Sequence, residues 1–194
     1  DDTVLRVYAA HGLARMGDPK SITALREAAG DKDDHVRRAA VLALGALSNE
    51  ADDVTVELLA RTLTKDREAR DVAALALART RHARAPALLR RAYEKGDRVH
   101  QPFAALALGL LARELGDASL VKPLVRDLEE RANADLRGAL ALAVGLGRCE
   151  DGAPALRKLV AERGDPQLRA YAALALGLME DRFGGPAVLR PLLT

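Results

Sequence analysis

Apolar residues recur along the chain with the three- and four-residue spacing of amphipathic helices, and one twelve-residue pattern returns six times. The aligned copies begin at Leu5, Val36, Ala69, His100, Leu136 and Leu168. The second copy reads VRRAAVLALGAL, and the sixth reads LRAYAALALGLM. Neighbouring copies start 31, 33, 31, 36 and 32 residues apart. A period of this length is typical of proteins built from stacked helical repeats.

Each copy is predicted to be a helix with its own start signal. Three residues before each copy stands an Asp or Asn, which can accept hydrogen bonds from the free N–H groups of the first turn. These residues are Asp2, Asp33, Asp66, Asp97, Asn133 and Asp165. In the fourth copy, Pro102 would disrupt a helix that began directly after Asp97, so this helix is expected to start late or to kink.

A second amphipathic stretch follows each copy, as at Ile22 and Leu25 after the first and at Val188 and Leu192 after the sixth. Pro86, Pro154 and Pro186 stand where proline suits the first turn of this second helix. We call the six copies the Arg-type helices, because five have Arg at their second position, and the intervening ones the Pro-type helices. The predicted helix pairs cover residues 1–30, 31–64, 65–95, 96–131, 132–163 and 164–194.

Three local motifs connect this pattern to a known family. The copies start as D-x-x-[VL]-R-x-x-A, three of them end in A-L-G, and Pro-Ala-Leu opens two Pro-type helices. The chain therefore resembles the HEAT-repeat proteins, especially the short bacterial repeats of the phycobilisome-lyase type. The resemblance implies an all-α, armadillo-like fold, a right-handed α-solenoid (an α–α superhelix) of about six helix pairs, with the Arg-type helices on its concave side. The family's ladders place an Asp six residues before the Arg, which only Asp31 and Arg37 match.

The chain is expected to be one solenoid over residues 1–194 and a segment of a longer array. It opens on an Arg-type helix without a preceding Pro-type partner, and it ends on the apolar tail Val188-Leu189-Arg190-Pro191-Leu192-Leu193. Neither end has the polar outer face that a terminal repeat needs in water. We therefore expect further repeats or other domains of a parent chain, or a partner docked at one end.

Composition agrees with an all-helical fold, because 39 Ala and 34 Leu stand among 194 residues and aromatic residues make up only 3%. No run approaches the roughly 20 apolar residues of a membrane-spanning helix. The single cysteine, Cys149, excludes an internal disulfide framework. The compartment stays open, with the cytoplasm slightly favoured.

The Arg-type helices are apolar nearly all round. Their first, fourth, fifth, eighth and twelfth positions should face the core, which would bury Tyr8, Phe103 and Tyr171 at the fourth position. The third, sixth and tenth positions are mostly small, and the seventh is Leu in five copies. Two interpretations remain open: the small residues let neighbouring helices pack closely, or they line a shallow apolar groove for a partner peptide.

Charge is concentrated in the third repeat, since residues 61–98 carry eleven Lys and Arg against five Asp and Glu. Arg79, Arg81, His82 and Arg84 fall at one predicted turn and could meet phosphate or an acidic protein surface. The alternative is a solvated turn. Nucleic acid is disfavoured, because no aromatic residues stand among these cations to stack on bases, and it remains an alternative only at this repeat.

Few residues are candidates for catalysis or metal binding. The four histidines occupy different repeat positions, none is followed by Glu, and His11 near Tyr8 is expected to be an interior structural residue. Cys149 lies in a predicted turn, where the flanking Arg148 could lower its pKa modestly. No metal-ligand spacing occurs, and no cofactor is predicted.

The sequence predicts a non-enzymatic scaffold that binds a protein or peptide partner along its concave side. The candidate contact residues are Arg38, Asp71, Arg79, Arg81 and Arg84 on the rim and Leu75, Leu106 and Leu142 beneath them. Arg6, Arg37, Arg70, Arg137 and Arg169 are interpreted as structural links between repeats. The alternatives are a bilin-lyase-like enzyme or a nucleic-acid-repair HEAT enzyme that uses the basic third repeat, or a structural spacer in a larger multidomain protein.

Overall fold

The computed structural model describes residues 2–130, 133–162 and 164–179. Eleven α-helices and two 3₁₀ turns account for most of these residues, and no strand occurs among them. The predicted all-α helical-repeat fold is confirmed, while its right-handed turn and its count of six pairs stay predictions. Within the described ranges, no helix has the length and apolar character needed to cross a bilayer.

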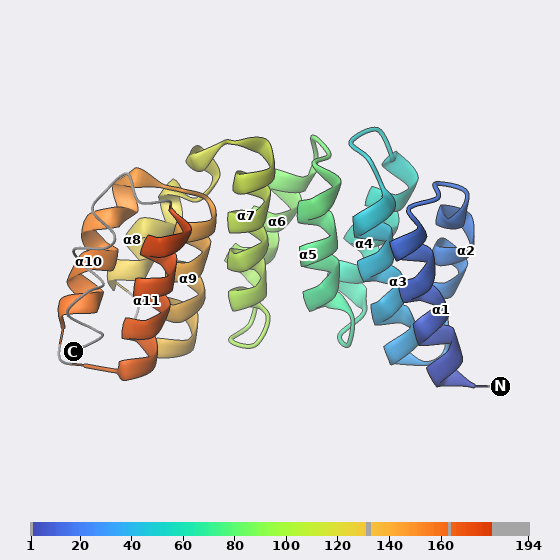
Figure 1. Ribbon diagram of the computed structural model, residues 1–194, viewed down its shortest axis with the longest axis horizontal. Helices are drawn as coiled ribbons and strands as arrows, with labels where there is room; N and C mark the ends of the chain where they lie inside the picture. Colours follow the sequence, from blue (N-terminus) through green and yellow to red (C-terminus); the bar gives the residue numbers. More distant parts are fainter. Residues whose placement is uncertain (1, 131–132, 163, 180–194) are drawn as a thin grey trace. The chain divides into compact units, whose positions relative to one another are not determined.

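The helices divide into two compact units, one ending at Gly96 and the other beginning at Asp97 (Figure 1). The first unit contains α1 (Thr3–Met16), α2 (Ser21–Ala28), α3 (Asp34–Leu47), α4 (Asp53–Lys65), α5 (Arg70–Thr80) and α6 (Ala85–Lys95). The second unit contains α7 (Gln101–Leu115), η1 (Ala118–Leu120), α8 (Lys122–Glu130), α9 (Ala134–Leu146), η2 (Glu150–Gly152), α10 (Ala153–Ala161) and α11 (Pro166–Leu178). The predicted Pro-type helix around Val188 and Leu192, with Pro186, lies outside the described residues.

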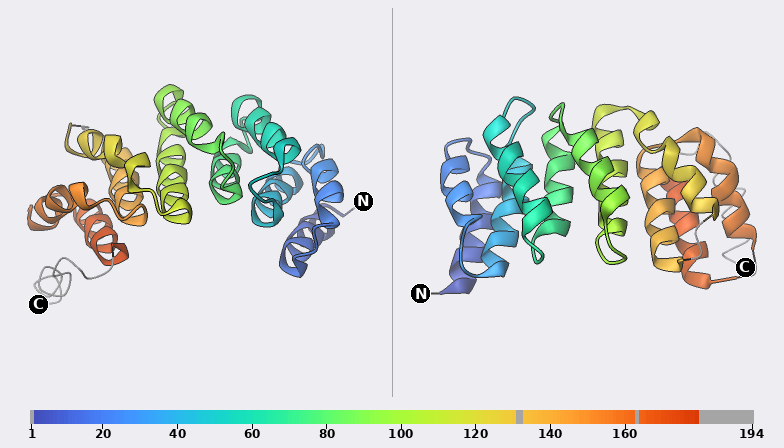
Figure 2. Two further views of the ribbon diagram at one scale, coloured as in Figure 1. Left: turned by 90° about the horizontal axis from the view of Figure 1, so that it is seen from above. Right: turned by 180° about the vertical axis from the view of Figure 1, so that it is seen from behind.

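Within each unit the Arg-type helices form one layer and the Pro-type helices a second layer behind it (Figure 2). In the first unit α1, α3 and α5 pack side by side, and in the second unit α7, α9 and α11 do the same. Most Pro-type helices pack mainly on the Arg-type helix that follows them, as α2 does on α3 and α4 on α5, whereas α6 packs on the preceding α5. Most of these contacts therefore join helices that the sequence assigned to different pairs. The division of the chain into six helix pairs stays a prediction.

Small residues bring neighbouring Arg-type helices into backbone contact. A Cβ atom added to Gly45 would lie 2.5 Å from Cα of Ala76, and one added to Gly145 would lie 2.6 Å from Cα of Ala175. Gly109 is equally close to Ala143, at 2.6 Å. All three contacts join the tenth position of one helix to the eighth position of the next. Close packing, the first of the two interpretations of the small-residue stripe, is confirmed for these three helix pairs.

The predicted N-caps are confirmed at four helices. Side chains of Asp2, Asp33, Asn133 and Asp165 accept hydrogen bonds from backbone N–H groups in the first turns of α1, α3, α9 and α11.

Asp66 and Asp97 accept bonds from backbone N–H groups two and three residues ahead, so they cap a turn that precedes the α-helix. The helices α5 and α7 then begin at Arg70 and Gln101. The late start expected from Pro102 is confirmed, since this proline occupies the first turn of α7.

The first helix departs from the predicted burial. Leu5, Tyr8 and Met16 stand at core positions of the repeat, yet they are 67%, 70% and 72% exposed. In α3 the equivalent face is covered by α2, whereas none of the described residues covers this face of α1. The expectation of an interior His11 and a buried Tyr8 is therefore wrong, because both side chains are exposed. Phe103 and Tyr171, also expected in the core, are half-buried.

Leu108 tests the register of the repeat core. Its side chain is only 2% exposed, inside α7. Replacement by alanine removes buried methyl groups and leaves a cavity, so Leu108→Ala should lower the free energy of unfolding by about 2–5 kcal/mol. Urea unfolding followed by circular dichroism measures this loss. An unchanged midpoint would mean that Leu108 does not belong to the core.

The glycine contacts give a second prediction. Gly45→Ala should destabilise the protein by roughly 1–3 kcal/mol, because the new methyl group meets the backbone of α5. Gly177→Ala is the matched control, since Gly177 holds the same repeat position in α11 and a Cβ added there would meet no neighbouring atom of the described residues within 4 Å. This control should leave stability unchanged or raise it by up to about 1 kcal/mol, the helix preference of alanine over glycine. Equal effects of the two substitutions would contradict the close contact.

Candidate partner-binding surface

The leucines at the seventh position of the Arg-type helices are the apolar side chains that this layer leaves partly open. Leu75 on α5, Leu106 on α7 and Leu142 on α9 are half-buried, and Leu174 on α11 is 55% exposed. The residues at the sixth position are buried instead in α1, α3, α5, α7 and α9, where the helices pack together. Within each unit, the seventh position therefore contributes apolar surface to the face of the Arg-type layer.

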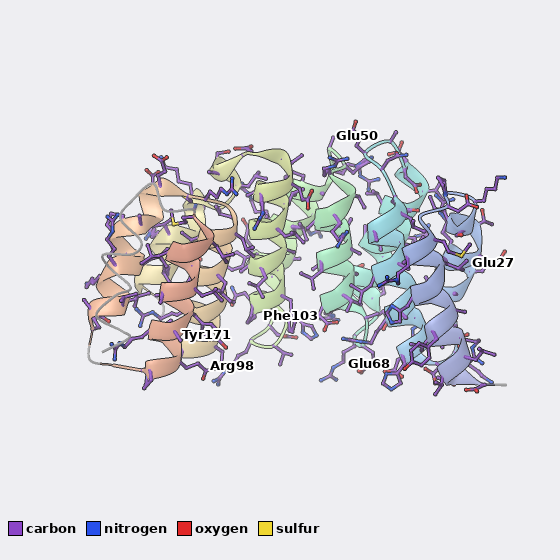
Figure 3. The ribbon with its side chains drawn as sticks, in the orientation of Figure 1. Glu27, Glu50, Glu68, Arg98, Phe103 and Tyr171 are labelled. Atoms are coloured by element: carbon purple, nitrogen blue, oxygen red, sulfur yellow. The ribbon has the colours of Figure 1, made fainter. Side chains whose placement is uncertain are left out.

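Two of the predicted rim residues bind each other. Arg38 Nη1 donates to Asp71 Oδ1 at 2.9 Å, and Arg38 Nη2 donates to Asp71 Oδ2 at 3.2 Å. The same guanidinium also donates to the main-chain carbonyl of Glu68, a residue labelled in Figure 3. This two-pronged pair closes the surface between α3 and α5. A partner would have to share or displace Arg38 and Asp71, which are structural contacts in the protein as it stands.

The predicted basic turn does form between α5 and α6, but its side chains differ in exposure. Arg79 and Arg81 are exposed, and neither forms a hydrogen bond or ion pair with the part of the chain that the structure describes. Arg81 caps α5 in the left-handed conformation, with φ of 54°. Arg84 is exposed as well, and its Nη2 lies 3.1 Å from Glu57 of α4.

His82, at the centre of the same turn, points into the protein and is only 7% exposed. Its Nε2 lies 3.1 Å from Asp53 Oδ1, and its Nδ1 accepts a hydrogen bond from the main-chain N–H of Arg84. His82 therefore holds the turn against α4. Of the four residues that the sequence grouped here, Arg79 and Arg81 are the two whose side-chain charges have no partner among the described residues.

The second unit contains a cleft in the face of its Arg-type layer. Its volume is about 210 Å³, and it lies between α7, α9 and α11. Leu106 and Leu142, both predicted contact residues, line it together with Gly138, Tyr171, Asp135 and Gln167. The structure thus brings two predicted leucines into one hollow and surrounds them with residues that the sequence did not single out.

Gly138 explains why the hollow exists. It occupies the third position of α9, where α3 has Arg38 and α5 has Asp71. A Cβ atom on Gly138 would lie 2.6 Å from the ring of Tyr171, so the glycine lets the aromatic ring lie against the α9 backbone. The hydroxyl of Tyr171, which is labelled on α11 in Figure 3, accepts a hydrogen bond of 2.9 Å from Gln167. The exchange of a charged residue for glycine at this position was the signal that could have revealed the cleft.

Four of the arginines predicted as structural links form such contacts: Arg6, Arg37, Arg137 and Arg169. Arg6 Nε lies 3.0 Å from Asp31, and Arg37 Nε lies 2.8 Å from Asp66, so each guanidinium reaches the next repeat. The ladder thus extends beyond the one match to the family spacing. Hydrogen bonds from Arg37 hold the pKa of the Asp66 carboxyl below its ordinary value, and the same pair raises the pKa of Arg37.

In the second unit, the equivalent arginines bind main-chain carbonyls instead. Arg137 donates to Leu128 at the end of α8, and Arg169 donates to Val160 at the end of α10. Each bond fastens a Pro-type helix to the Arg-type helix that follows it.

The structure also places the other reactive side chains. Cys149 is buried, and burial raises its pKa, so the lowered pKa expected from Arg148 is wrong. His100 Nδ1 lies 2.6 Å from Asp97 Oδ1, a contact that lowers the pKa of this carboxyl. Within residues 2–130, 133–162 and 164–179, no group of three or more His, Cys, Asp or Glu side chains could hold a metal ion.

Comparison with known families agrees with the helical layers described above. The family model for HEAT repeats matches residues 1–71, which include α1 to α4 and the start of α5. Over these residues the chain is therefore similar to HEAT repeats. No curated protein matches it.

The Arg37–Asp66 pair generates a pH-dependent prediction. Asn at position 66 keeps the capping oxygen but removes the charge, so Asp66→Asn should lower the free energy of unfolding at pH 7 by about 1–2 kcal/mol. Because the folded state depresses the pKa of Asp66, this stabilisation is complete above the unfolded pKa of about 3.9. It is lost as the pH falls through the lower folded value.

Urea unfolding of both proteins at pH 7 and pH 2.5 measures this change. The difference between wild type and Asp66→Asn should shrink markedly at the lower pH. Glu50→Gln is the control, since Glu50 is exposed and forms no ion pair within the described residues. A difference that stays constant between the two pH values would contradict the role of the Asp66 charge.

Proposed function

We propose that the protein is a scaffold that binds a segment of another protein along the exposed face of its Arg-type helices. Stacked helical repeats present extended surfaces of this kind, because each repeat adds the same face to the array. The observation that carries the proposal is the cleft of about 210 Å³ over Leu106 and Leu142. It combines an apolar floor with a few polar groups at its edge, which is the usual composition of a binding hollow.

The half-buried leucines supply the apolar part of the proposed contact. Leu75 in the first unit and Leu106 and Leu142 in the second hold equivalent repeat positions, so a partner could find a similar contact in each unit. Burying the remaining exposed surface of such side chains contributes roughly 25 cal/mol per Å². Affinity in this proposal comes mainly from these leucines.

Arg79 and Arg81 supply the charged part in the first unit. Both are exposed without a partner in the described ranges, so an acidic side chain could pair with them without breaking an existing contact. Such exposed pairs contribute little to affinity and more to the rate and selectivity of association. Arg38, Asp71 and Arg84 have internal partners and play a smaller role in this proposal.

The uncovered face of α1 supports the proposal that the repeats belong to a larger assembly. Leu5, Tyr8 and Met16 present there the side chains that α3 buries under α2. An amphipathic helix with the pattern of α2 would cover them in the same way. This contact would be separate from the partner segment on the face of the Arg-type helices.

The proposal is tested by capturing partners from a lysate of the source cells on the immobilised full chain. Leu106→Asp combined with Leu142→Asp should lower the recovery of at least one wild-type partner about tenfold or more, because two charges then stand in the apolar floor. Val54→Asp is the matched control, since Val54 lies on α4 and is 63% exposed. Thermal melting followed by circular dichroism verifies that each variant is folded.

Recovery of the same proteins by the double variant and by wild type would overturn the proposed surface. Loss of the same proteins with Val54→Asp would also count against it, because the effect would then not be specific to this face.

A further inference from the structure

We propose that the cleft over Gly138 binds one basic side chain, of arginine or lysine, carried by the partner segment. This inference rests on the proposed function and names the chemistry that the cleft would select. It depends on three features of the second unit: the size of the hollow, its apolar floor, and the sign of the charges at its edge.

The cleft is large enough to admit a long side chain. Its volume is about 210 Å³, and it opens to solvent, so a side chain can enter while the main chain of the partner lies across its mouth.

The floor suits the aliphatic stem of such a side chain. Leu106 and Leu142 contribute apolar side chains from α7 and α9, and Gly138 lines the cleft with them without a side chain of its own. The Tyr171 ring forms one wall, and its hydrogen bond to Gln167 fixes the orientation of the phenol. Lysine and arginine commonly lay their methylene groups on apolar surface while the charge stays in water, and an aromatic wall attracts the charge further.

The edge of the cleft is acidic. Asp135 and Asp165 line it, and among the described residues no lysine or arginine does. The arginines on the same helices are engaged elsewhere, since Arg137 and Arg169 donate to carbonyls of α8 and α10. Charge complementarity therefore favours a cation and disfavours a carboxylate or phosphate.

Asp135 is available to an incoming cation. Its nearest ion-pair partner is Arg98, whose Nη2 lies 3.8 Å away, and both side chains are 78% exposed. A long, exposed pair of this kind is weak and easily exchanged. Asp165 accepts the main-chain N–H of Gln167 with one oxygen, Oδ1, so it adds negative charge beside the hollow.

The first unit shows what the cleft replaces. At the third repeat position, α3 and α5 carry Arg38 and Asp71, which pair with each other at 2.9 Å. In the proposed complex, the partner brings the cation that α9 lacks, and Asp135 serves as the acid. The positions of α9 and α11 that correspond to Arg38 and Asp71 are Gly138 and Ala170, so that internal ion pair is absent at the cleft.

Three small probes test this inference on the full chain. Butylguanidinium has a short aliphatic stem and a cation, butylurea is its neutral counterpart, and pentanoate is an anion of similar length. Each is titrated while amide resonances of Gly138 and Leu142 are followed by ¹H–¹⁵N correlation spectra. We expect butylguanidinium to shift these amides in a saturable manner, butylurea to bind more weakly, and pentanoate to produce no saturable shift.

Two variants separate charge from shape. Asp135→Asn should weaken butylguanidinium about two- to fivefold, the range of an exposed ion pair, and leave butylurea unchanged. Asp34→Asn is the matched control, because Asp34 is a first-turn acid of another Arg-type helix outside the cleft, and it should alter neither probe. Thermal melting verifies that both variants are folded.

Saturable binding of pentanoate at the same amides, or butylguanidinium binding that is unaffected by Asp135→Asn, would overturn the inference. The proposed function would survive that result if the Leu106 and Leu142 double variant still lost its partners. Conversely, probe binding with the expected charge preference, together with unchanged partner capture, would place a cation site in a protein whose partners dock elsewhere.

Discussion

The repeats depend on one contact, the approach of a glycine on one Arg-type helix to the backbone of the next. Gly45, Gly109 and Gly145 meet Ala76, Ala143 and Ala175 so closely that a methyl group would not fit. Helices in such close contact bury the sixth-position residues of α1, α3, α5, α7 and α9 and leave the seventh-position leucines partly open. The exposed face of each unit is therefore a consequence of the same spacing that holds its helices together.

Much of the fold could be predicted from the sequence because the same pattern of capping, apolar and small residues recurs six times. Four helix starts, the late start at Pro102 and the small-residue contacts all depend on local chemistry and spacing. Burial at particular residues could not be derived in this way. Tyr8 and Tyr171 share one repeat position, yet Tyr8 is 70% exposed and Tyr171 lies against Gly138. The burial of each tyrosine depends on which helix packs beside it. The position of a residue within the repeat does not specify that neighbouring helix.

The candidate surface shows the same division. The sequence identified Leu106 and Leu142, since their place on the helix follows from periodicity, and the structure brings both into one cleft. It also grouped His82 with Arg79 and Arg81, although His82 turns inward to Asp53. Asp135 and Gln167 escaped notice because their significance comes from proximity to Gly138 and Tyr171 across three helices. The side chains that line the cleft come from different repeats. Their proximity depends on the tertiary structure and cannot be predicted from the repeat pattern alone.

The arginine links of the first unit have a direction. Arg6 reaches forward to Asp31, and Arg37 reaches forward to Asp66, so in these two links the acceptor stands in the repeat after its donor. Loss of an acceptor therefore releases a guanidinium that belongs to the preceding repeat, and the damage is transmitted toward the amino terminus. Tension along the first unit would load these two links in series, from donor to acceptor.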